Sequence, residues 1–203
     1  MYAHLVENVS LYDREWVKIR GDMAFESIAQ GYFDYEKTWE KLVRKKGVVV
    51  QAGGYCGVFP RLLAETYDQV YTFEPDPLNF FCLSINCQSD NIVKIQGGLS
   101  NTYGLLEVVR TNHNNKGMNI TRKSSNATIP SFRIDDLGLT SCDLIVLDTE
   151  GYEKNILLGA IQTISKFKPV VSVEDTTTQI EELLEDYGYQ LRVIVHRDSI
   201  YSI

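Results

Sequence analysis

The sequence predicts an α/β fold in which a doubly wound, mostly parallel sheet of seven strands has helices on both faces. From residue 48 onward, short runs of β-branched residues alternate with amphipathic stretches, as strands alternate with helices in such folds. The runs Val48–Val50 and Leu144–Leu147 are apolar throughout. Continuous apolar runs are typical of central parallel strands, because both of their faces are covered.

The alternation also predicts where each element lies. Six of the seven strands are expected at Val48–Ala52, Val70–Phe73, Ile92–Gln96, Leu144–Leu147, Val170–Glu174 and Leu191–His196. Helices are expected near Pro60–Tyr67, Pro77–Cys87, Lys154–Lys166 and Thr178–Tyr187. Ligands of open α/β sheets bind at the carboxyl ends of the strands. The residues directly after each strand are therefore the first candidates for a site.

Residues 1–46 lie outside this alternation, and we expect them to form an N-terminal helical cap on a domain that spans residues 47–203. The segment is rich in aromatic residues, and its helical pattern is strongest from Tyr35 to Lys46. A helix can favourably end in cations, because they interact with its dipole. We interpret in this way the one dense basic cluster, which consists of Lys41, Arg44, Lys45 and Lys46.

A polar stretch, Thr111–Thr128, is expected to be a long connection between Leu105–Arg110 and Ile129–Ile134. Long loops in compact domains are often lids or other functional segments. The stretch contains His113, whose neutral imidazole could act as a base near pH 7. The alternative is a solvated loop histidine, since no orienting partner is visible in the sequence.

Composition and charge exclude several classes of protein. The formal net charge of -7 and the pI near 5.0 argue against a protein that binds nucleic-acid phosphates. The four cysteines occur without a CxxC pair, so neither a zinc site nor a disulfide framework is expected. No apolar run approaches the roughly 20 residues that span a bilayer, and the first residues lack the order of a signal peptide. We therefore expect a cytoplasmic protein without a membrane partner.

A buried strand, a glycine-rich turn and a helix follow one another from Val48 to Leu63. Gly53, Gly54 and Gly57 make the turn, and glycine permits both positive φ and the close approach of a ligand. The next strand ends in an acid, Glu74, about 20 residues later, where an acid can accept hydrogen bonds from the ribose of an adenosine-containing cofactor.

Two alternatives apply to this segment. The first is an ordinary strand-to-helix turn followed by a solvated acid. The second is a dinucleotide site, but its GxGxxG pattern would need glycine at position 52, where Ala52 stands. A cofactor with a pyrophosphate is therefore less well supported than one without.

Three separated blocks then carry a family resemblance: Gln51–Gly57, Glu74–Pro77 followed by Leu83 and Asn86, and Leu147–Glu153. They are similar to the D-x-G-A-N-x-G, E-P-x-P with L-x-x-N, and I-D-x-E-G-x-E blocks of the FkbM-type SAM-dependent methyltransferases. Smaller similarities lie at Gly98–Asn101, Ile134–Leu137 and Val173–Glu174. The resemblance implies a Rossmann-like class I methyltransferase that binds S-adenosyl-L-methionine (SAM). Gln51 stands where the family usually has Asp, and Val146 where it commonly has Lys.

The resemblance also implies roles for individual residues. Residues expected to bind the cofactor are Gln51, Gly53, Gly54, Tyr55, Gly57, Glu74, Pro75, Asp76, Leu99, Ser100 and Asp148. Candidate catalytic residues are Asp148, Glu150, Glu174 and His113. Crowded carboxylates raise one another's pKa, which suits a base, and they could instead bind a divalent metal. The alternative is that Glu150 and Glu153 only favour a helix dipole and that Glu174 lies in a surface turn.

The function that the resemblance implies is methyl transfer to a hydroxyl of a sugar, polysaccharide or small metabolite, so the expected partner is a small-molecule or glycan acceptor and not nucleic acid. One rival is an NAD(P)-dependent oxidoreductase, which Ala52 and the lack of a Tyr-x-x-x-Lys pair after the middle strand disfavour. The other is a catalytically silent SAM-binding protein, which Gln51 leaves open.

Overall fold

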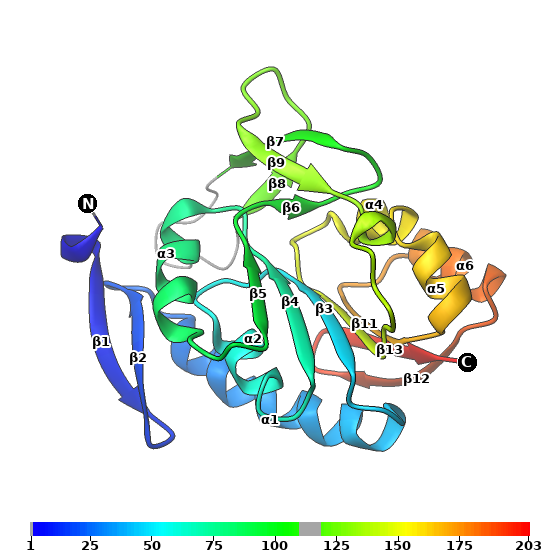
Figure 1. Ribbon diagram of the computed structural model, residues 1–203, viewed down its shortest axis with the longest axis horizontal. Helices are drawn as coiled ribbons and strands as arrows, with labels where there is room; N and C mark the ends of the chain where they lie inside the picture. Colours follow the sequence, from blue (N-terminus) through cyan, green and yellow to red (C-terminus); the bar gives the residue numbers. More distant parts are fainter. Residues whose placement is uncertain (1, 110–118) are drawn as a thin grey trace.

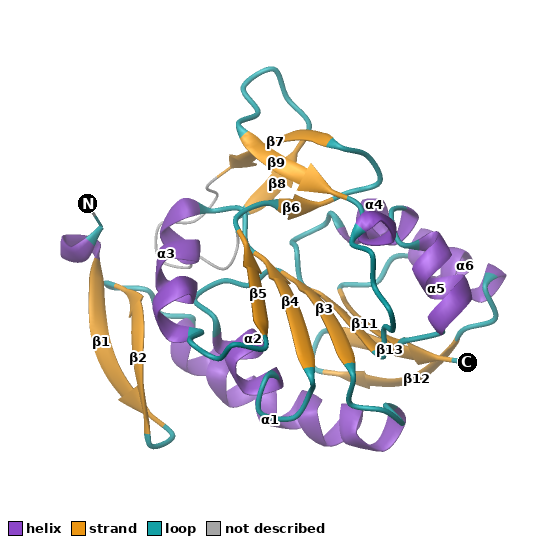
Figure 2. Ribbon diagram, in the orientation of Figure 1, coloured by secondary structure: helices purple, strands orange, loops and turns teal. Residues whose placement is uncertain are grey.

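The computed structural model describes residues 2–109 and 119–203 and contains one large sheet flanked by helices (Figures 1 and 2). The strands of the large sheet are β3 (Val48–Ala52), β4 (Gln69–Phe73), β5 (Ile92–Ile95), β10 (Leu144–Leu147), β11 (Val170–Glu174), β12 (Gln190–Val195) and β13 (Asp198–Ser202). The helices are α1 (Phe25–Leu42), α2 (Val58–Leu63), α3 (Pro77–Asn86), α4 (Glu153–Leu158), α5 (Ile161–Phe167) and α6 (Thr178–Asp186), and short 3-10 turns occupy Ala3–Leu5 and Ile134–Asp136.

The large sheet has seven strands in the order β12-β13-β11-β10-β3-β4-β5. The strands from β11 to β5 are parallel, whereas β13 is antiparallel to both β11 and β12. The predicted fold class, a mostly parallel seven-stranded α/β sheet, is confirmed. The order of the strands changes direction between β3 and β10, which is where such sheets bind ligands.

Successive residues of the central strands point to opposite faces and so enter two separate cores. On one face, Val49 and Val146 pack in a cluster with residues of α1 and α2. On the other face, Val50 and Ile145 pack with residues of α4, α5 and α6. The covered positions on both faces explain why these strands are almost wholly apolar.

The N-terminal segment differs from the helical cap that the sequence predicts. Residues 6–19 form an antiparallel hairpin of β1 (Val6–Leu11) and β2 (Arg14–Ile19), and α1 begins only at Phe25. Tyr12 and Asp13 both have positive φ (53° and 56°), as a two-residue hairpin turn requires. The hairpin lies at the side of the molecule next to α3 (Figure 1).

Asn86 at the end of α3 fastens this hairpin. Its Oδ1 accepts from the backbone N–H of Val17, and its Nδ2 donates to the Val17 carbonyl, both at 2.7 Å. The same Nδ2 donates to the Cys56 carbonyl at 2.7 Å. The side chain of Asn86 therefore pairs with β2 as a neighbouring strand would, and it joins the hairpin to the turn after β3.

Two further elements depart from the expected positions. The helix expected at Lys154–Lys166 is two helices, α4 and α5, because the chain breaks at Gly159 and Ala160. The last strand, β13, has no counterpart among the expected strands. It supplies Asp198, Ser199 and Ile200 to the interior.

A second sheet of four strands follows β5 in the sequence and stands over the carboxyl ends of the large sheet (Figures 1 and 2). Its order is β6 (Gly98–Leu99), β9 (Ile129–Phe132), β7 (Gly104–Val109) and β8 (Ile120–Arg122). Part of the polar stretch expected to be a loop, Thr111–Thr128, is thus a strand. His113 lies outside the described residues.

The remaining expectations concern cysteines, basic residues and membrane spans. All four cysteines are buried and free, as expected. Lys41 lies in the last turn of α1, but the helix ends at Leu42, so Arg44, Lys45 and Lys46 follow it rather than belong to it. Within the described ranges, no helix combines the length and the apolar character that crossing a membrane requires.

Candidate functional site

A cleft lies at the carboxyl ends of β3, β4 and β10, under the second sheet. Its lining consists of residues 51–55 at the end of β3 and in the turn that follows, residues 73–75 around the end of β4, Gly98 and Leu99, and Asp148 and Thr149 after β10. Asn119 and Thr121, which belong to the second sheet and its approach, also line it. The cleft is therefore where the topology predicts a ligand.

Gln51 orders the glycine turn through its side-chain amide. Its Nε2 donates to the carbonyl of Gly53 at 2.7 Å, and its Oε1 accepts from the hydroxyl of Thr72 at 2.6 Å. The side chain is only 1% exposed. A buried amide in this position can hold the turn without a charge, because it supplies a donor to the turn and an acceptor to the neighbouring strand.

The glycines of the turn are needed for packing. Gly53 has a φ of +85°, and a Cβ there would collide with the backbone carbonyl of Asp148. At Gly54, a Cβ would lie 2.5 Å from Leu83 Cδ1 and 2.7 Å from Thr72 Oγ1. The turn therefore lies close against β4, α3 and the end of β10, and this close approach brings the acids of β4 and β10 to one cleft.

Glu74 is buried at the end of β4 and binds the backbone around it. Its Oε2 accepts from the N–H of Tyr55 at 2.7 Å, and its Oε1 accepts from the N–H of Asp76 at 2.8 Å and from Asn79 Nδ2 at 3.4 Å. Burial raises the pKa of this carboxyl to about 8, although the hydrogen bonds to the backbone oppose the shift. Glu74 thus both lines the cleft and holds the glycine turn.

Tyr55 links this turn to the N-terminal segment. It has a positive φ of 47°, and its hydroxyl donates to the carboxylate of Asp22. Burial raises the pKa of the Tyr55 hydroxyl far above its usual range. The residue therefore stays neutral and fixes the position of the turn relative to the start of α1.

Asp148 and Glu174 form a carboxyl pair where β10 and β11 end side by side. The Asp148 side chain is open to the cleft, yet protein surrounds it closely. Burial, the charge of Glu174 and a hydrogen bond with Glu174 raise the pKa of Asp148 well above its usual range. Asp148 therefore keeps a proton to higher pH than an isolated carboxyl would, beside Glu174.

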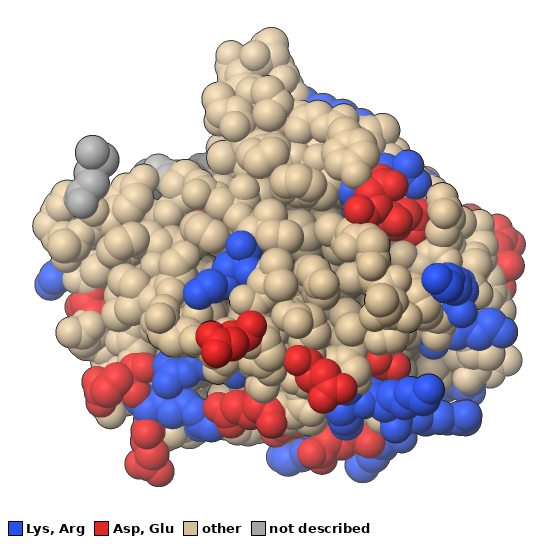
Figure 3. Space-filling model, in the orientation of Figure 1, with Lys and Arg blue, Asp and Glu red and all other residues tan. Residues whose placement is uncertain are grey.

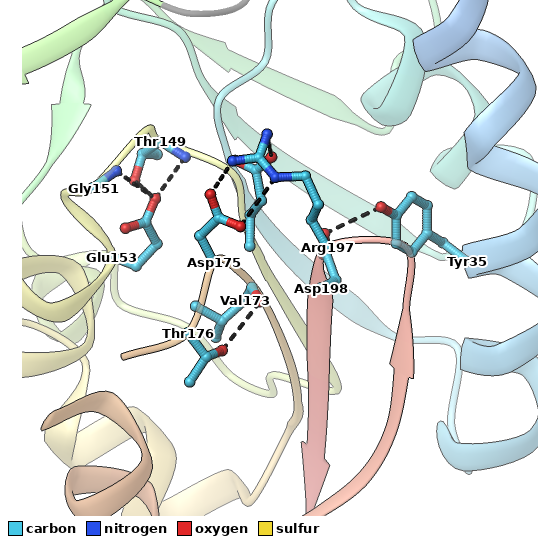
Figure 4. A network of polar contacts seen from close by, with 10 residues as sticks. Tyr35, Thr149, Gly151, Glu153, Val173, Asp175, Thr176, Arg197 and Asp198 are labelled. Atoms are coloured by element: carbon cyan, nitrogen blue, oxygen red, sulfur yellow. Dashed lines mark hydrogen bonds and ion pairs between the residues drawn. The ribbon is translucent and has the colours of Figure 1, made fainter. Parts of the chain in front are cut away.

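Arg197 supplies a positive charge beside Glu174, and Figure 4 shows its contact with Asp175. Its Nη1 lies 2.9 Å from Glu174 Oε1, and its Nε donates to Asp175 Oδ1 at 3.0 Å. Asp198, the next residue, accepts from Ser172 Oγ at 2.9 Å and from the hydroxyl of Tyr35 at 3.2 Å. Burial raises the pKa of Asp198 to about 6. Tyr35 and Asp198 of β13 thus belong to the group of polar side chains around Glu174.

The turn after Asp148 is held by Glu153, the first residue of α4 (Figure 4). One oxygen of Glu153 accepts from the N–H and the hydroxyl of Thr149, both at 2.9 Å, and from the N–H of Gly151 at 3.1 Å. Glu150 and Gly151 both have positive φ (54° and 97°), which these bonds help to maintain. Glu153 therefore shapes the turn and is 3% exposed, whereas Glu150 remains near the carboxyl pair.

A sequence model of the FkbM methyltransferase domain matches residues 52–191 of this chain, which is more than half of its length. The chain belongs to the FkbM methyltransferase family. None of the curated protein sequences matches it.

Solved structures with a similar fold include the FkbM methyltransferase of Methylobacillus flagellatus KT, with 18% identity and a TM-score of 0.52 over 89% of this chain. This chain covers 58% of that protein. M. jannaschii TYW2, solved in complex with AdoMet, has 13% identity and a TM-score of 0.53, with coverage of 98% of this chain and 86% of that one. The precorrin-6y C5,15-methyltransferase of Geobacter metallireducens GS-15 has 13% identity and a TM-score of 0.54, with 95% of each chain covered. At such identities the likeness is one of fold.

In this FkbM family member, the residues expected to bind the cofactor fall into two groups. Those that line the cleft are Gln51, Gly53, Gly54, Tyr55, Glu74, Pro75, Leu99 and Asp148. Gly57, Asp76 and Ser100 do not line it. Asp76 begins α3, where its Oδ1 accepts from Leu78 and Asn79, and Ser100 is fully buried beside Tyr152. These three residues lie behind the residues that line the cleft.

The candidate catalytic carboxylates of the FkbM chain do come together. Ligand oxygens of Asp148, Glu150 and Glu174 all lie within 4.8 Å of one another. Five further residues of the site were not predicted from the sequence: Arg197, Asp198, Tyr35, Asn119 and Thr121. Arg197 and Asp198 follow the strand expected to be last, so the turn from β12 into β13 was the signal that could have revealed them.

Proposed function

We propose that this protein is a SAM-dependent methyltransferase that methylates a hydroxyl of a sugar, a polysaccharide or another small metabolite. The family supports the class of reaction. One observation carries the proposal. A single cleft is lined by Glu74, which can accept hydrogen bonds from a ribose, and by Asp148 of the Asp148–Glu174 carboxyl pair, which can take up a proton. The acceptor class rests on the family resemblance.

The residues of the cleft fit an adenosyl cofactor. Pro75 and Leu99 provide apolar contacts for a base, Glu74 retains acceptor capacity for ribose hydroxyls, and the backbone of Gly53 and Gly54 is open to the amino-acid part. When bound, SAM supplies a methyl group on a positively charged sulfur. The carboxylates near Asp148 favour that positive charge.

The carboxyl pair can take up the proton that an acceptor hydroxyl loses as its oxygen bonds to carbon. The raised pKa of Asp148 suits it to receive this proton at the cleft, and its hydrogen bond with Glu174 lets the two carboxyls share the proton. Asp148 is the member that faces the cleft, and Glu174 stands behind it, paired with Arg197. The chain's own contribution is thus to orient the acceptor, to exclude water and to receive a proton.

A divalent metal is the alternative occupant of this acidic group. Asp148, Glu150 and Glu174 are close enough to share an ion. However, the guanidinium of Arg197 already lies 2.9 Å from Glu174, and the raised pKa of Asp148 favours its protonated form, which is a poor metal ligand. Both observations favour proton transfer over metal binding at this site.

The proposal includes an acceptor that is not a nucleic acid. The net charge of -7 opposes binding to phosphates, and on the face shown in Figure 3 acidic and basic side chains intermingle along the lower edge without a broad basic surface. The second sheet, at the top of that view, is largely uncharged (Figure 3). A neutral glycan or metabolite suits such surroundings.

The test is methyl transfer from SAM with a labelled methyl group to a panel of hydroxyl-bearing sugars, polysaccharides and small metabolites. We expect label in at least one acceptor, and we expect the substitution Asp148→Asn to abolish most of the transfer. Asp186→Asn, an exposed acid at the end of α6, is the matched control and should transfer normally. Binding of SAM without transfer to any member of the panel would favour the silent binding protein instead.

A further inference from the structure

Asn119 lines the cleft, and its side-chain oxygen has no hydrogen-bond partner among the described residues. It stands directly before β8, and its side chain lines the cleft from the side of the second sheet. Its Nδ2 donates to Asp76 Oδ2 at 3.3 Å. Its Oδ1 is buried and has no hydrogen-bond partner in the part of the chain that the structure describes. Such an atom is costly in a folded protein unless a ligand or water supplies a donor.

Asp76 determines how the side-chain amide of Asn119 is oriented, because it bonds to the amide nitrogen. The Oδ1 of Asp76 accepts from the N–H groups of Leu78 and Asn79 at the start of α3, at 2.8 and 3.2 Å, and this anchors the carboxylate. A carboxylate can only accept, so the amide nitrogen of Asn119 has to face it. The amide oxygen is therefore the end of the Asn119 side chain that has no partner among the described residues and can accept from a ligand.

The position of Asn119 indicates which donor it meets. The sheet order β10-β3-β4 places Asp148 and Glu74 on strands that are not neighbours, with the glycine turn between them. In the proposed function, Asp148 marks the methyl end of the cofactor and Glu74 the ribose. Asn119 lines the cleft and contacts Asp76, which follows Glu74 and Pro75 in the chain, so Asn119 lies on the Glu74 side of the cleft. This is the base end, and the exocyclic amine is the hydrogen-bond donor of adenine.

We infer that Asn119 Oδ1 accepts a hydrogen bond from the exocyclic amine of adenine and so makes the cleft selective for an adenine nucleoside. The inference rests on the proposed function. Asn119 acts as a specificity residue that the second sheet contributes to the cofactor cleft, and Asp76 acts as its positioning residue.

The test compares two ligands by calorimetry: S-adenosylhomocysteine, and its analogue in which hydrogen replaces the exocyclic amine. The intact protein should bind the analogue about 3- to 10-fold more weakly, the range of one neutral hydrogen bond. Asn119→Ala should bind S-adenosylhomocysteine more weakly by a similar factor and should no longer distinguish the two ligands. Asn126→Ala, at an exposed asparagine in the turn between β8 and β9, is the matched control and should keep the full distinction.

The outcomes separate this inference from the proposed function. If the intact protein binds S-adenosylhomocysteine and the analogue equally, the inference is overturned, whether or not the variant folds. If Asn119→Ala is folded by circular dichroism and still prefers the amine, the inference is likewise overturned. If the protein binds neither S-adenosylhomocysteine nor SAM, the proposed function itself fails.

Discussion

The carboxylate of Glu74 accepts a hydrogen bond of 2.7 Å from the backbone N–H of Tyr55, so the acid that ends β4 also holds the glycine turn that follows β3. A residue expected to bind a ribose is therefore part of the framework of its own site. This double role determines how changes at Glu74 should be measured, because a loss of ligand affinity and a loss of stability will occur together.

The first prediction concerns the pH dependence of stability. Burial raises the pKa of Glu74 to about 8 in the folded chain, from 4.5. Between these values the folded chain keeps a proton that the unfolded chain has lost, so the free energy of unfolding should fall as pH rises from about 5 to 8. Urea unfolding at several pH values measures this slope. Glu74→Gln cannot ionise and should show a shallower fall; an identical slope in both proteins would contradict the raised pKa.

The second prediction concerns Gln51. In Gln51→Glu, a carboxylate oxygen would face the Gly53 carbonyl, which now accepts from Nε2 at 2.7 Å. We expect a loss of about 1–3 kcal/mol in the free energy of unfolding and a weaker affinity for S-adenosylhomocysteine. Thr72→Val removes only the donor to Gln51 Oε1 and should cost stability while affinity changes little. Affinity at the level of the unmodified protein in Gln51→Glu would show that the turn does not depend on this amide.

The third prediction compares SAM, which carries a positive sulfur, with neutral S-adenosylhomocysteine. Asp148→Asn confines the negative charge of the carboxyl pair to Glu174, which stands behind the position of the expected methyl, and should lower the preference for SAM about two- to fivefold. Arg197→Met removes the cation that lies 2.9 Å from Glu174 and should raise that preference. Calorimetry with both ligands measures the ratio. Arg192→Met, an exposed residue of β12, should leave it unchanged. Shifts of the same sign in both site variants would argue against the placement of the methyl.

The fourth prediction tests the attachment of the hairpin. Asn86→Ala removes three hydrogen bonds of 2.7 Å, to both backbone groups of Val17 and to the Cys56 carbonyl. We expect a loss of about 2–4 kcal/mol, because buried backbone groups would lose their partners. Denaturant unfolding measures it. Asn126→Ala should have almost no effect, and a loss under about 0.5 kcal/mol in Asn86→Ala would mean that water replaces the side chain.

The fold was predictable where strands are nearly continuous apolar runs. The ranges of β3, β10 and β11 agree with the expected strands, because those strands are buried on both faces and are therefore almost wholly apolar. β13 was missed because its sequence, Asp-Ser-Ile-Tyr-Ser, is mixed and its polar residues are buried through specific hydrogen bonds. The hairpin at residues 6–19 was missed because the aromatic residues around it suggested a helical segment.

The site was predictable only as far as the ends of strands. Glu74, Asp148 and Glu174 each end or follow a strand, so their convergence followed from the topology. Arg197 and Asn119 come from a late turn and from the approach to a short strand, and tertiary structure alone brings them to the cleft. The roles of Glu153 and Asn86 depend on distances to backbone groups, which no sequence pattern contains.

The central claim is that the cleft binds SAM, and the most direct measurement is the thermal unfolding of the protein with SAM, S-adenosylhomocysteine or NAD(H) over a range of concentrations. Selective binding to the folded state raises Tm with ligand concentration. We expect SAM and S-adenosylhomocysteine to raise Tm and NAD(H) to leave it unchanged. Stabilisation by NAD(H) and by neither of the other two ligands would contradict the central claim.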